Sequence, residues 1–312
     1  SIAVICISVF TRQQAVVSYS TRNDSVTISE KNDNNIPDKK ELIENSGNMK
    51  YDNVIVTAST SAYYDKLLTL ISSIHKYYKD PQNVISIDQI LVYDLGLTEI
   101  QVLNLSNLLN VTVKRLPQNK LAFPEMLEPK GYAYKWPMVS DATEYSDYVL
   151  WIDAGVMFWK NPGIVFEILH KEEVFLVQDA HLNRNWTSEE ARKIMEASEE
   201  ELNGKQLSAG ITGFKSNGKY QSMLNDCVKY ANIKDCVFGK SAYSDSEVKS
   251  TGIFGHRHDQ SISSILAVRY HCPTQSIGRF GEYNQLNLDE NNAVIFVHRG
   301  SYEDHTSLIF RS

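Results

Sequence analysis

From residue 53 onward, short apolar runs alternate with amphipathic stretches, and this alternation constrains the fold more than any other feature of the chain. The run at residues 53–58 (NVIVTA) is rich in β-branched side chains and has the length of one buried strand. Four apolar residues then recur at helical spacing: Leu67, Leu70, Ile71 and Ile74. Strands that alternate with helices are typical of α/β domains with a mostly parallel sheet and helices on both faces.

The same alternation continues to residue 297. Further strands are expected at residues 87–93, 111–116, 148–152, 174–177, 209–214 and 293–297. Further helices are expected after the capping box of Thr98 and Gln101 and at residues 134–145, 187–195, 219–230 and 260–270. Thr187 and Glu190 have the spacing to cap the helix that ends near Met195, and Pro137 falls in a first helical turn, where proline is tolerated.

Composition narrows the class of protein. The 312 residues are 42% hydrophobic and 22% charged, with a mean hydropathy of −0.31, as in globular domains. No apolar run approaches the ~18 residues that a membrane span needs. Because 38 acidic residues outnumber 31 basic ones, no basic field covers the molecule, and nucleic-acid binding is not expected.

The first 50 residues differ from the rest. Residues 2–10 are almost entirely apolar, as in the end of a signal anchor, although a buried strand has the same pattern. Residues 18–53 are rich in Asn, Asp, Lys and Ser, as in a solvated tether. We expect residues 1–50 to be an anchor remnant plus a disordered stem. The expected location is the Golgi or endoplasmic reticulum lumen, as a single-pass type II membrane glycoprotein, or outside the cell.

Glycosylation motifs and cysteines are compatible with this location. Sequons occur at Asn23, Asn104, Asn110 and Asn185. The four cysteines form no C-x-x-C pair: Cys6, Cys227, Cys236 and Cys272. Cys227 and Cys236 could form a disulfide or remain two buried thiols.

Polar residues just past the predicted strands are candidates for a binding site, because ligands of parallel sheets bind outside the carboxyl ends of the strands. The candidates are Thr57, Ser59, Asp94, Asp153, Asp179 and His298. Asp153 follows an apolar strand, where a carboxylate needs a cation or strong donors to stay ionised. His298 ends the last expected strand in the same manner. Each of these residues could instead cap a strand or helix locally.

Two histidines, His256 and His258, lie in an H-x-H sequence that places both rings on one side of an extended segment. Such a pair can bind zinc, but no third ligand follows at a recognisable spacing. A polar loop that lines an acceptor cleft is the favoured interpretation.

Several short motifs then occur in a fixed order along residues 54–298. They are Thr57 with Tyr63 or Tyr64, VYDLGLTEIQ at 92–101, YAYKW at 132–136, WIDAGVMF at 151–158, SAGITG at 208–213, Asp259 with Gln260, and His298. In this order they resemble the GT-A glycosyltransferases, especially the retaining glycogenin-like and galactinol-synthase-like group. The chain is also similar to uncharacterised invertebrate proteins of the nucleotide-diphospho-sugar transferase type. Residues 51–312 would form the catalytic domain.

The resemblance implies transfer of a sugar from a nucleotide-sugar, expected to be a UDP-sugar, to a hydroxyl of a glycan or glycoprotein, with retention. It implies Asp153, Asp259 and Asp179 as catalytic residues and His181, Trp186 and Gln260 as acceptor-binding residues. Donor binding would involve Thr57, Tyr63, Tyr64, Asp94, Lys135 and Arg299.

The resemblance further implies a manganese ion on Asp153 and His298, but Gly155 stands where the family has its second acid. Either these two residues hold the metal with the diphosphate, or Lys135 and Arg299 neutralise the diphosphate in its absence. Gly155 also favours an alternative, a scaffold that binds a nucleotide or glycan without turnover. A weaker alternative is a metal-dependent hydrolase that uses the HRHD segment at 256–259.

Overall fold

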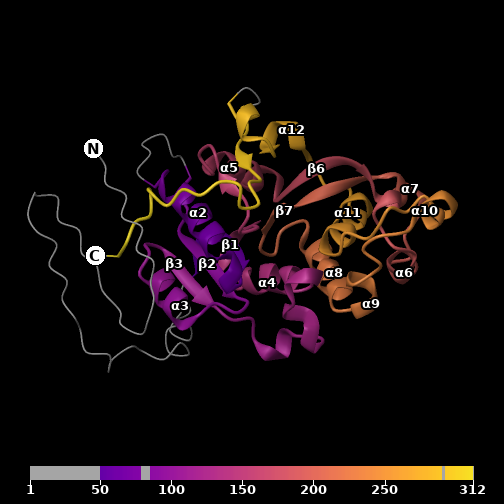
Figure 1. Cartoon of the computed structure of the whole chain (residues 1–312), viewed down its shortest axis with the longest axis horizontal. Helices are drawn as coiled ribbons and strands as arrows, with labels where there is room; N and C mark the ends of the chain where they lie inside the picture. Colours follow the sequence, from indigo (N-terminus) through magenta and orange to yellow (C-terminus); the bar gives the residue numbers. More distant parts are fainter. Residues whose placement is uncertain (1–49, 79–84, 290–291, 312) are drawn as a thin grey trace, which may run out of the picture.

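The computed structural model describes residues 50–78, 85–289 and 292–311 (Figure 1). The anchor remnant and stem expected in residues 1–50 lie outside these residues, apart from Lys50. Among the residues that the structure describes, no helix combines the length and the apolar character required to cross a bilayer.

A seven-stranded sheet forms the centre of the molecule, with the strand order β3-β2-β1-β4-β7-β6-β8. Its strands are β1 (Tyr51–Ser59), β2 (Gln89–Asp94), β3 (Val111–Lys114), β4 (Ser146–Ile152), β6 (Val174–Leu182), β7 (Lys205–Lys215) and β8 (Gln275–Ser276). Neighbouring strands are parallel except that β7 runs antiparallel to both β4 and β6. The predicted α/β fold with a mostly parallel sheet is confirmed.

Helices cover both faces of this sheet, as expected. In β1, Val54 and Val56 point to one face and Ile55 to the other, and all three are fully buried. The first face packs against α4 (Lys135–Ala142), α8 (Gln221–Ala231) and α11 (Asp259–Arg269). The second packs against α2 (Tyr64–His75), α3 (Glu99–Ser106) and α5 (Gly163–Glu172). β1 is apolar on both sides because both faces are covered.

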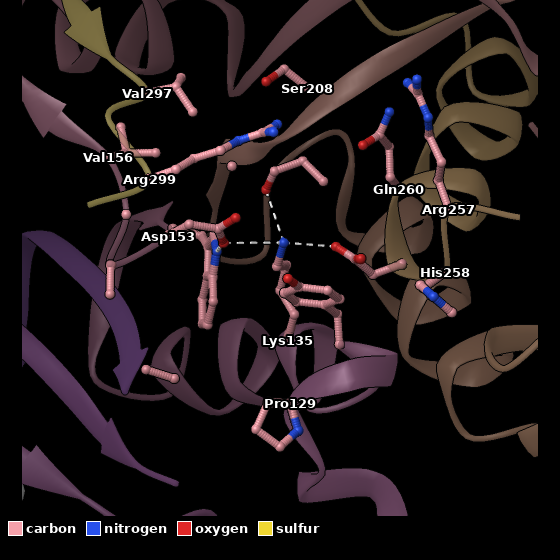
Figure 2. A pocket seen from close by; sticks show the side chains of 18 of the residues that line it. Pro129, Lys135, Asp153, Val156, Ser208, Arg257, His258, Gln260, Val297 and Arg299 are labelled. Atoms are coloured by element: carbon pink, nitrogen blue, oxygen red, sulfur yellow. Dashed lines mark hydrogen bonds and ion pairs between the residues drawn. The ribbon is translucent and has the colours of Figure 1, made fainter. Parts of the chain in front are cut away.

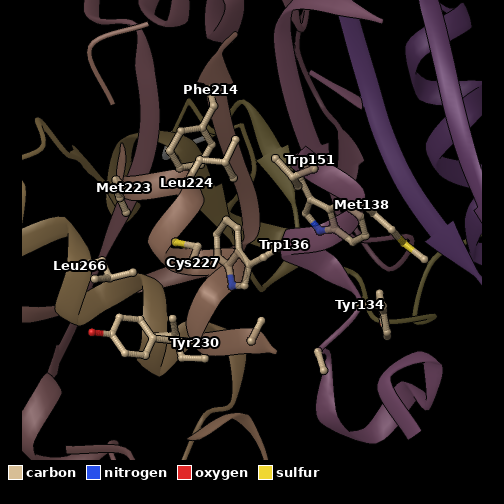
Figure 3. Close-up of a cluster of buried hydrophobic side chains, with 14 of the residues drawn as sticks. Tyr134, Trp136, Met138, Trp151, Phe214, Met223, Leu224, Cys227, Tyr230 and Leu266 are labelled. Carbon is tan, nitrogen blue, oxygen red and sulfur yellow. The ribbon is translucent and has the colours of Figure 1, made fainter. Parts of the chain in front are cut away.

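Large aromatic side chains fill the first face (Figure 3). Trp136 of α4 packs edge to face against Phe214 of β7, with ring centroids 6.2 Å apart. Trp151 of β4 and Leu224 of α8 belong to the same buried cluster. This packing fixes the start of α4 against the end of β4, where Lys135 and Asp153 lie.

The predictions made for the helix ends are confirmed in part. The capping box of Thr98 and Gln101 opens α3 as predicted. Pro137 lies in the first turn of α4. The predicted cap at Thr187 is wrong: Ser188 is the N-cap of α6 (Glu189–Ile194), because its hydroxyl accepts the Ala191 N–H. The other short helices are α7 (Glu199–Asn203), α9 (Lys234–Val237), α10 (Asp245–Thr251) and α12 (Ile277–Phe280).

Two of the predicted strand ends are also wrong. β6 continues to Leu182 by pairing with β7 through register shifts, so Asp179 lies within a strand rather than past its end. The strand expected at residues 293–297 is only β10 (Ile295–Phe296). It joins β5 (Met157–Phe158) and β9 (Gly281–Glu282) in a separate small sheet. His298 therefore does not follow a strand of the central sheet.

Cys227, Cys236 and Cys272 are free thiols, so the alternative disulfide between Cys227 and Cys236 is not formed. Burial raises the pKa of the Cys236 and Cys272 thiols to about 12. The C-terminal segment crosses α2 and the end of α3, where the Leu109 N–H donates to the Ile309 carbonyl.

Candidate functional site

A cavity of about 820 Å³ opens at the carboxyl ends of β1 and β4 (Figure 2). Ser59 of β1, Asp153 after β4 and Ser208 of β7 line it, together with the first residues of α4 and α11, Lys135 and Asp259. This is the edge of the sheet where ligands of α/β proteins bind. The fold therefore gathers residues that are far apart in the sequence around one space.

Lys135 lies at the bottom of this cavity and is only 1% exposed. Its Nζ is 2.7 Å from Oδ2 of Asp259 and 3.3 Å from Oδ1 of Asp153. It also donates to the Ala209 carbonyl at 3.0 Å, and Figure 2 shows the three contacts around the ammonium. The ammonium is therefore surrounded by two carboxylate oxygens and one carbonyl oxygen.

Burial and charge act in opposite directions on this group. Burial alone would lower the pKa of Lys135, but the carboxylates of Asp153 and Asp259 offset it and raise that pKa. Burial raises the pKa of Asp259, and the charge of Lys135 opposes this shift. Lys135 is therefore charged at neutral pH and holds the two carboxylates together.

The neighbourhood of Asp259 is constrained by its backbone. His258, which precedes α11, has φ 51° and ψ −122°, a conformation that a side chain with a Cβ rarely adopts. Its ring Nδ1 lies 2.9 Å from the Val237 carbonyl, which ties the strained residue to α9. Strain of this kind is retained where the surrounding structure holds it in place, and it is frequent at functional sites.

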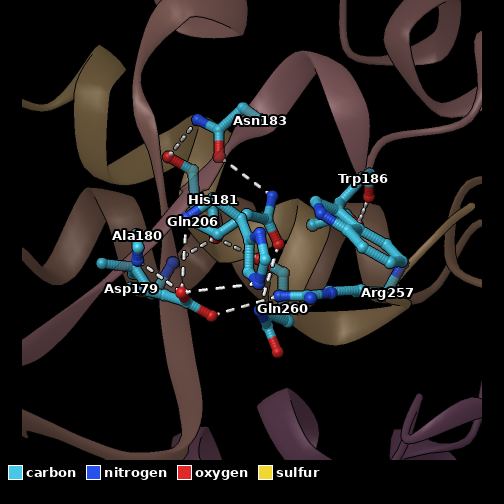
Figure 4. Close-up of polar contacts among 11 residues, drawn as sticks. Asp179, Ala180, His181, Asn183, Trp186, Gln206, Arg257 and Gln260 are labelled. Carbon is cyan, nitrogen blue, oxygen red and sulfur yellow. Dashed lines mark hydrogen bonds and ion pairs between the residues drawn. The ribbon is translucent and has the colours of Figure 1, made fainter. Parts of the chain in front are cut away.

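A second polar cluster includes Arg257 and Gln260, the neighbours of Asp259 in the sequence, and reaches the cavity wall (Figure 4). Arg257 Nη1 is 3.2 Å from Oδ2 of Asp179, and its guanidinium carbon is 3.9 Å from the centre of the Trp186 ring. The His181 ring meets the Trp186 ring at 66°, with centroids 5.6 Å apart. Gln260 donates to Gln206, and Gln206 in turn donates to Asn183. These contacts hold Arg257, His181 and Gln260 in fixed positions at the cavity wall.

A third group lies beside the small sheet. Arg299 lines the cavity, and its backbone N–H donates to the Gly155 carbonyl at 3.0 Å. His298 is buried and accepts the Gly300 N–H on Nδ1. Burial and the nearby charge of Lys66 lower the pKa of His298 to about 4, so its ring is neutral at neutral pH.

Most of the predicted site residues meet at this cavity. Those that line it are Tyr63, Lys135, Asp153, Asp179, His181, Asp259, Gln260 and Arg299. His256 and His258, predicted to lie in a polar loop at the acceptor cleft, line it as well. Asp179 reaches the cavity from within β6, and Ser59 from the end of β1.

Five predicted residues do not line it. Thr57 is fully buried within β1, and Tyr64 packs against the hydrophobic cluster on the α2 side of the sheet. Asp94 accepts the N–H groups of Gly96 and Leu97 and pairs with Arg115, which is the local capping role that polar residues take after strands. Trp186 supports Arg257, and His298 lies behind Arg299.

Four residues of this region were missed. Arg257 stands between the two histidines of the HRHD segment, and Tyr132 lies in the YAYKW motif, so both were within reach of the sequence reasoning. Lys66 and Tyr283 carry no local signal in the sequence. Tyr63, Tyr132 and Tyr283 line the cavity while remaining 47%, 39% and 51% exposed, which leaves aromatic faces available to a ligand.

Asp153 and His298 alone do not make up a manganese site, although Nε2 of His298 is buried without a hydrogen-bond partner in the described part of the chain. Asp153 already faces the Lys135 ammonium and accepts the Trp151 Nε1–H at 2.6 Å. Gly155 supplies no carboxylate, and the charge of Lys66 acts on the His298 ring. In the described part of the chain, no three His, Cys, Asp or Glu side chains form a group that could hold a metal.

Comparisons with known proteins place the fold. No family model matches the chain, and no curated protein matches it significantly. Among solved structures, the WbbM bifunctional glycosyltransferase is 14% identical, with a TM-score of 0.51 over 84% of this chain and 48% of the WbbM chain. This chain thus spans about half the length of WbbM.

The galactosyltransferase LgtC, in complex with donor and acceptor sugar analogs, is 16% identical over 78% of this chain and 86% of LgtC, with a TM-score of 0.44. An active-site mutant of LgtC gives the same values. The predicted fold is confirmed by the strand order, the covered faces and the likeness to WbbM. The chain has the GT-A fold of the glycosyltransferases.

Proposed function

We propose that this chain transfers a sugar from a nucleotide-sugar, in the first instance a UDP-sugar, to a hydroxyl of a glycan or glycoprotein acceptor, with retention at the anomeric carbon. One observation carries the proposal: Lys135 joins Asp153 and Asp259 at the bottom of an 820 Å³ cavity. This arrangement lies at the ligand-binding edge of a GT-A sheet. The fold alone does not assign the activity.

The two sides of the cavity suit the two substrates. Tyr63 and Arg299 offer an aromatic face and a cation to a nucleotide diphosphate. On the opposite side, Arg257 and Gln260 offer polar groups to a sugar hydroxyl (Figure 2). His181 lines the cavity as well. Trp186 acts there by fixing the guanidinium of Arg257 rather than by contact with the acceptor. Asp153 and Asp259 lie between the two sides, where the sugar would transfer.

The chemistry divides between the substrates and these residues. The bond from the anomeric carbon to the diphosphate oxygen breaks, and its electron pair stays on that oxygen. The acceptor oxygen forms the new bond to the anomeric carbon, and its proton passes to the departing diphosphate. Donors aimed at the diphosphate stabilise this transition state more than the ground state, because negative charge grows there.

Retention is supported by the state of the carboxylates. An inverting transfer needs a base that takes the proton from the acceptor. In the described residues, each of the three carboxylates that line the cavity already faces a cation: Asp153 and Asp259 face Lys135, and Asp179 faces Arg257. Transfer of the proton to the departing diphosphate requires no free carboxylate.

The proposal is tested by titration with UDP and by a screen of UDP-sugars for turnover. Asp153→Asn should reduce turnover by about 100-fold or more and leave the thermal transition close to that of the wild type. Asp147→Asn is the matched control, because Asp147 is the second residue of the same strand and its side chain, 42% exposed, pairs with Lys50 at the surface. Turnover that survives Asp153→Asn would refute the site assignment.

A non-catalytic scaffold is the second candidate, and Gly155 is the observation that favours it. This candidate predicts that UDP or a glycan binds while no UDP-sugar is consumed. The metal-dependent hydrolase has less support, because the described residues include no group of three potential metal ligands.

The expected secretory location belongs to the same proposal and depends on residues 1–50, which lie outside the described residues apart from Lys50. Of the three sequons within the described residues, Asn104 is exposed on α3, Asn110 is half-buried, and the Asn185 side-chain amide donates to the Gly252 carbonyl. A glycan is therefore expected at Asn104 rather than at Asn185.

A further inference from the structure

The cations at the cavity are not equally available to a ligand. Lys135 forms ion pairs with Asp153 and Asp259 and donates to the Ala209 carbonyl. Arg257 is paired with Asp179 and stacked on Trp186. In the described part of the chain, neither Arg299 nor Lys66 has an ion pair with a carboxylate.

Arg299 extends from the small sheet into the cavity toward Ser208 (Figure 2). Its backbone has φ 50°, a left-handed conformation that is uncommon for a residue with a side chain. The backbone N–H of Arg299 donates to the Gly155 carbonyl, which anchors the residue beside the end of β4. The guanidinium carbon is 5.7 Å from the centre of the Tyr283 ring, and within the described residues its N–H groups have no hydrogen-bond partner, so they are available to an anion.

Lys66 comes from α2 and lies beside the same part of the wall. Its Nζ is 3.8 Å from the centre of the Tyr63 ring, and Tyr63 lines the cavity. Gly300 touches its stem so closely that a Cβ at this position would lie 2.4 Å from Cε of Lys66. Gly300 also has φ 95°, so the close approach requires glycine. Lys66 is thus held next to the segment that carries Arg299.

We propose that Lys66 and Arg299 bind the diphosphate of the donor and replace a divalent cation, so that donor binding is independent of metal. This inference rests on the proposed function and states which side chains neutralise the negative charge of the donor diphosphate. Two cations without carboxylate partners would be attracted to a diphosphate and would stabilise the charge that grows on it during transfer. The absence of a carboxylate at Gly155 fits this arrangement, because a carboxylate there would lie beside Arg299 and compete with the diphosphate.

The test is calorimetric titration of the chain with UDP, once with a chelator and once with manganese. The wild-type affinity should agree within about twofold between the two conditions. Lys66→Met and Arg299→Met should each weaken binding in chelator by about tenfold or more, since each removes one charged contact. Lys76→Met is the matched control, because Lys76 is exposed at the other end of α2 and lies over the Tyr77 ring. It should bind UDP as the wild type does.

A second variant, Gly155→Asp, should make UDP binding depend on manganese. A Cβ at Gly155 would be 3.5 Å from Cα of Arg299, an ordinary contact, so Gly155→Asp fits without displacing the backbone. The new carboxylate should weaken UDP binding in chelator by about tenfold, and manganese should restore it.

The outcomes separate the two proposals. Wild-type binding that requires manganese, or wild-type affinity in both the Lys66 and Arg299 variants, would overturn the inference and leave the proposed function standing. Failure of the wild type to bind UDP in either condition would overturn both.

Discussion

Two cationic regions lie at the same cavity, one with Lys135 in its wall and one with Arg299 in the wall and Lys66 behind Tyr63, and they differ in how their charges are satisfied. Lys135 is 1% exposed and is surrounded by two carboxylates and a carbonyl. Arg299 and Lys66 have aromatic neighbours but no carboxylate partner among the described residues. A buried charge is retained in a protein when it is paired, so the Lys135 region is organised before any ligand arrives. Arg299 and Lys66 are the cations that an anionic ligand can pair with.

The largest effect on stability is expected from Lys135→Met, which removes the cation that pairs with Asp153 and Asp259. Methionine fills a similar volume but leaves the buried carboxylate of Asp259 without its cation. Removing one partner of a buried ion pair costs about 3–5 kcal/mol in the free energy of unfolding. Urea unfolding measures this loss, and UDP titration under conditions where the variant is folded should show a weaker donor site.

The double variant Lys135→Met with Asp259→Asn is the control for this change. Because it removes the buried charge together with its partner, it should recover part of the lost stability without recovering turnover. A single variant as stable as the wild type would show that Lys135 and Asp259 do not form the pair that organises the cavity.

His256 shows a third way to satisfy a buried ionisable group, which is to keep it neutral. Burial, with a smaller effect from His258, lowers the pKa of His256 to about 3 from its ordinary 6.5. The stability that comes from the neutral ring is present above pH 6.5 and is lost as the pH falls toward 3, because the unfolded chain takes up the proton first. Between pH 7 and pH 5 this amounts to about 2 kcal/mol.

His256→Asn sharpens this point, because the amide oxygen of asparagine can accept the Ser188 N–H that Nδ1 of the histidine accepts. Urea unfolding at pH 7 and pH 5 should show a smaller loss of stability for the variant than for the wild type. Equal losses in both proteins would mean that His256 titrates as an exposed histidine does.

Arg257→Met tests the partly exposed pair on the acceptor side. Asp179 and Arg257 side chains are each 24% exposed, so the loss in stability should be only about 1 kcal/mol, including the stacking on Trp186. The KM for the acceptor should rise while the affinity for UDP stays unchanged. Arg257→Lys keeps the charge but not the planar stacking, so an intermediate KM is expected. A change confined to UDP affinity would place Arg257 on the donor side.

The fold was predictable from the sequence to the extent that its patterns are local. β1, β4 and α11 carry continuous apolar runs or helical spacing, and their positions agree with the structure within a few residues. β10 has two residues and pairs with β5 and β9, so no periodicity marks the sheet to which it belongs. The second part of β6 is polar and is a strand only because β7 pairs with it.

The sequence predicted most of the residues that line the site but not which of them contact one another. Asp153 and Asp259 were expected from the strand end and from the resemblance, and both line the cavity. Lys135 was expected to face the diphosphate, but its contact with Asp259, which is 124 residues further along the chain, depends on the first residues of α4 and α11 meeting, where Trp136 Nε1 donates to the Asp259 carbonyl. Lys66 enters the region only because Gly300 lets the chain pass close to α2.

The smallest effect on stability and on UDP affinity is expected from Gly155→Ala. This variant adds a side chain at position 155 without adding a charge. A Cβ there would make an ordinary contact at 3.5 Å with Cα of Arg299. The free energy of unfolding should therefore change by less than about 1 kcal/mol, and UDP affinity should match that of the wild type. Gly155→Asp adds a carboxylate to the same backbone position, so any difference between the two variants reports the charge alone. If alanine weakens UDP binding as much as aspartate does, glycine is required for space, and the unpaired state of Arg299 does not explain why no acid stands at this position.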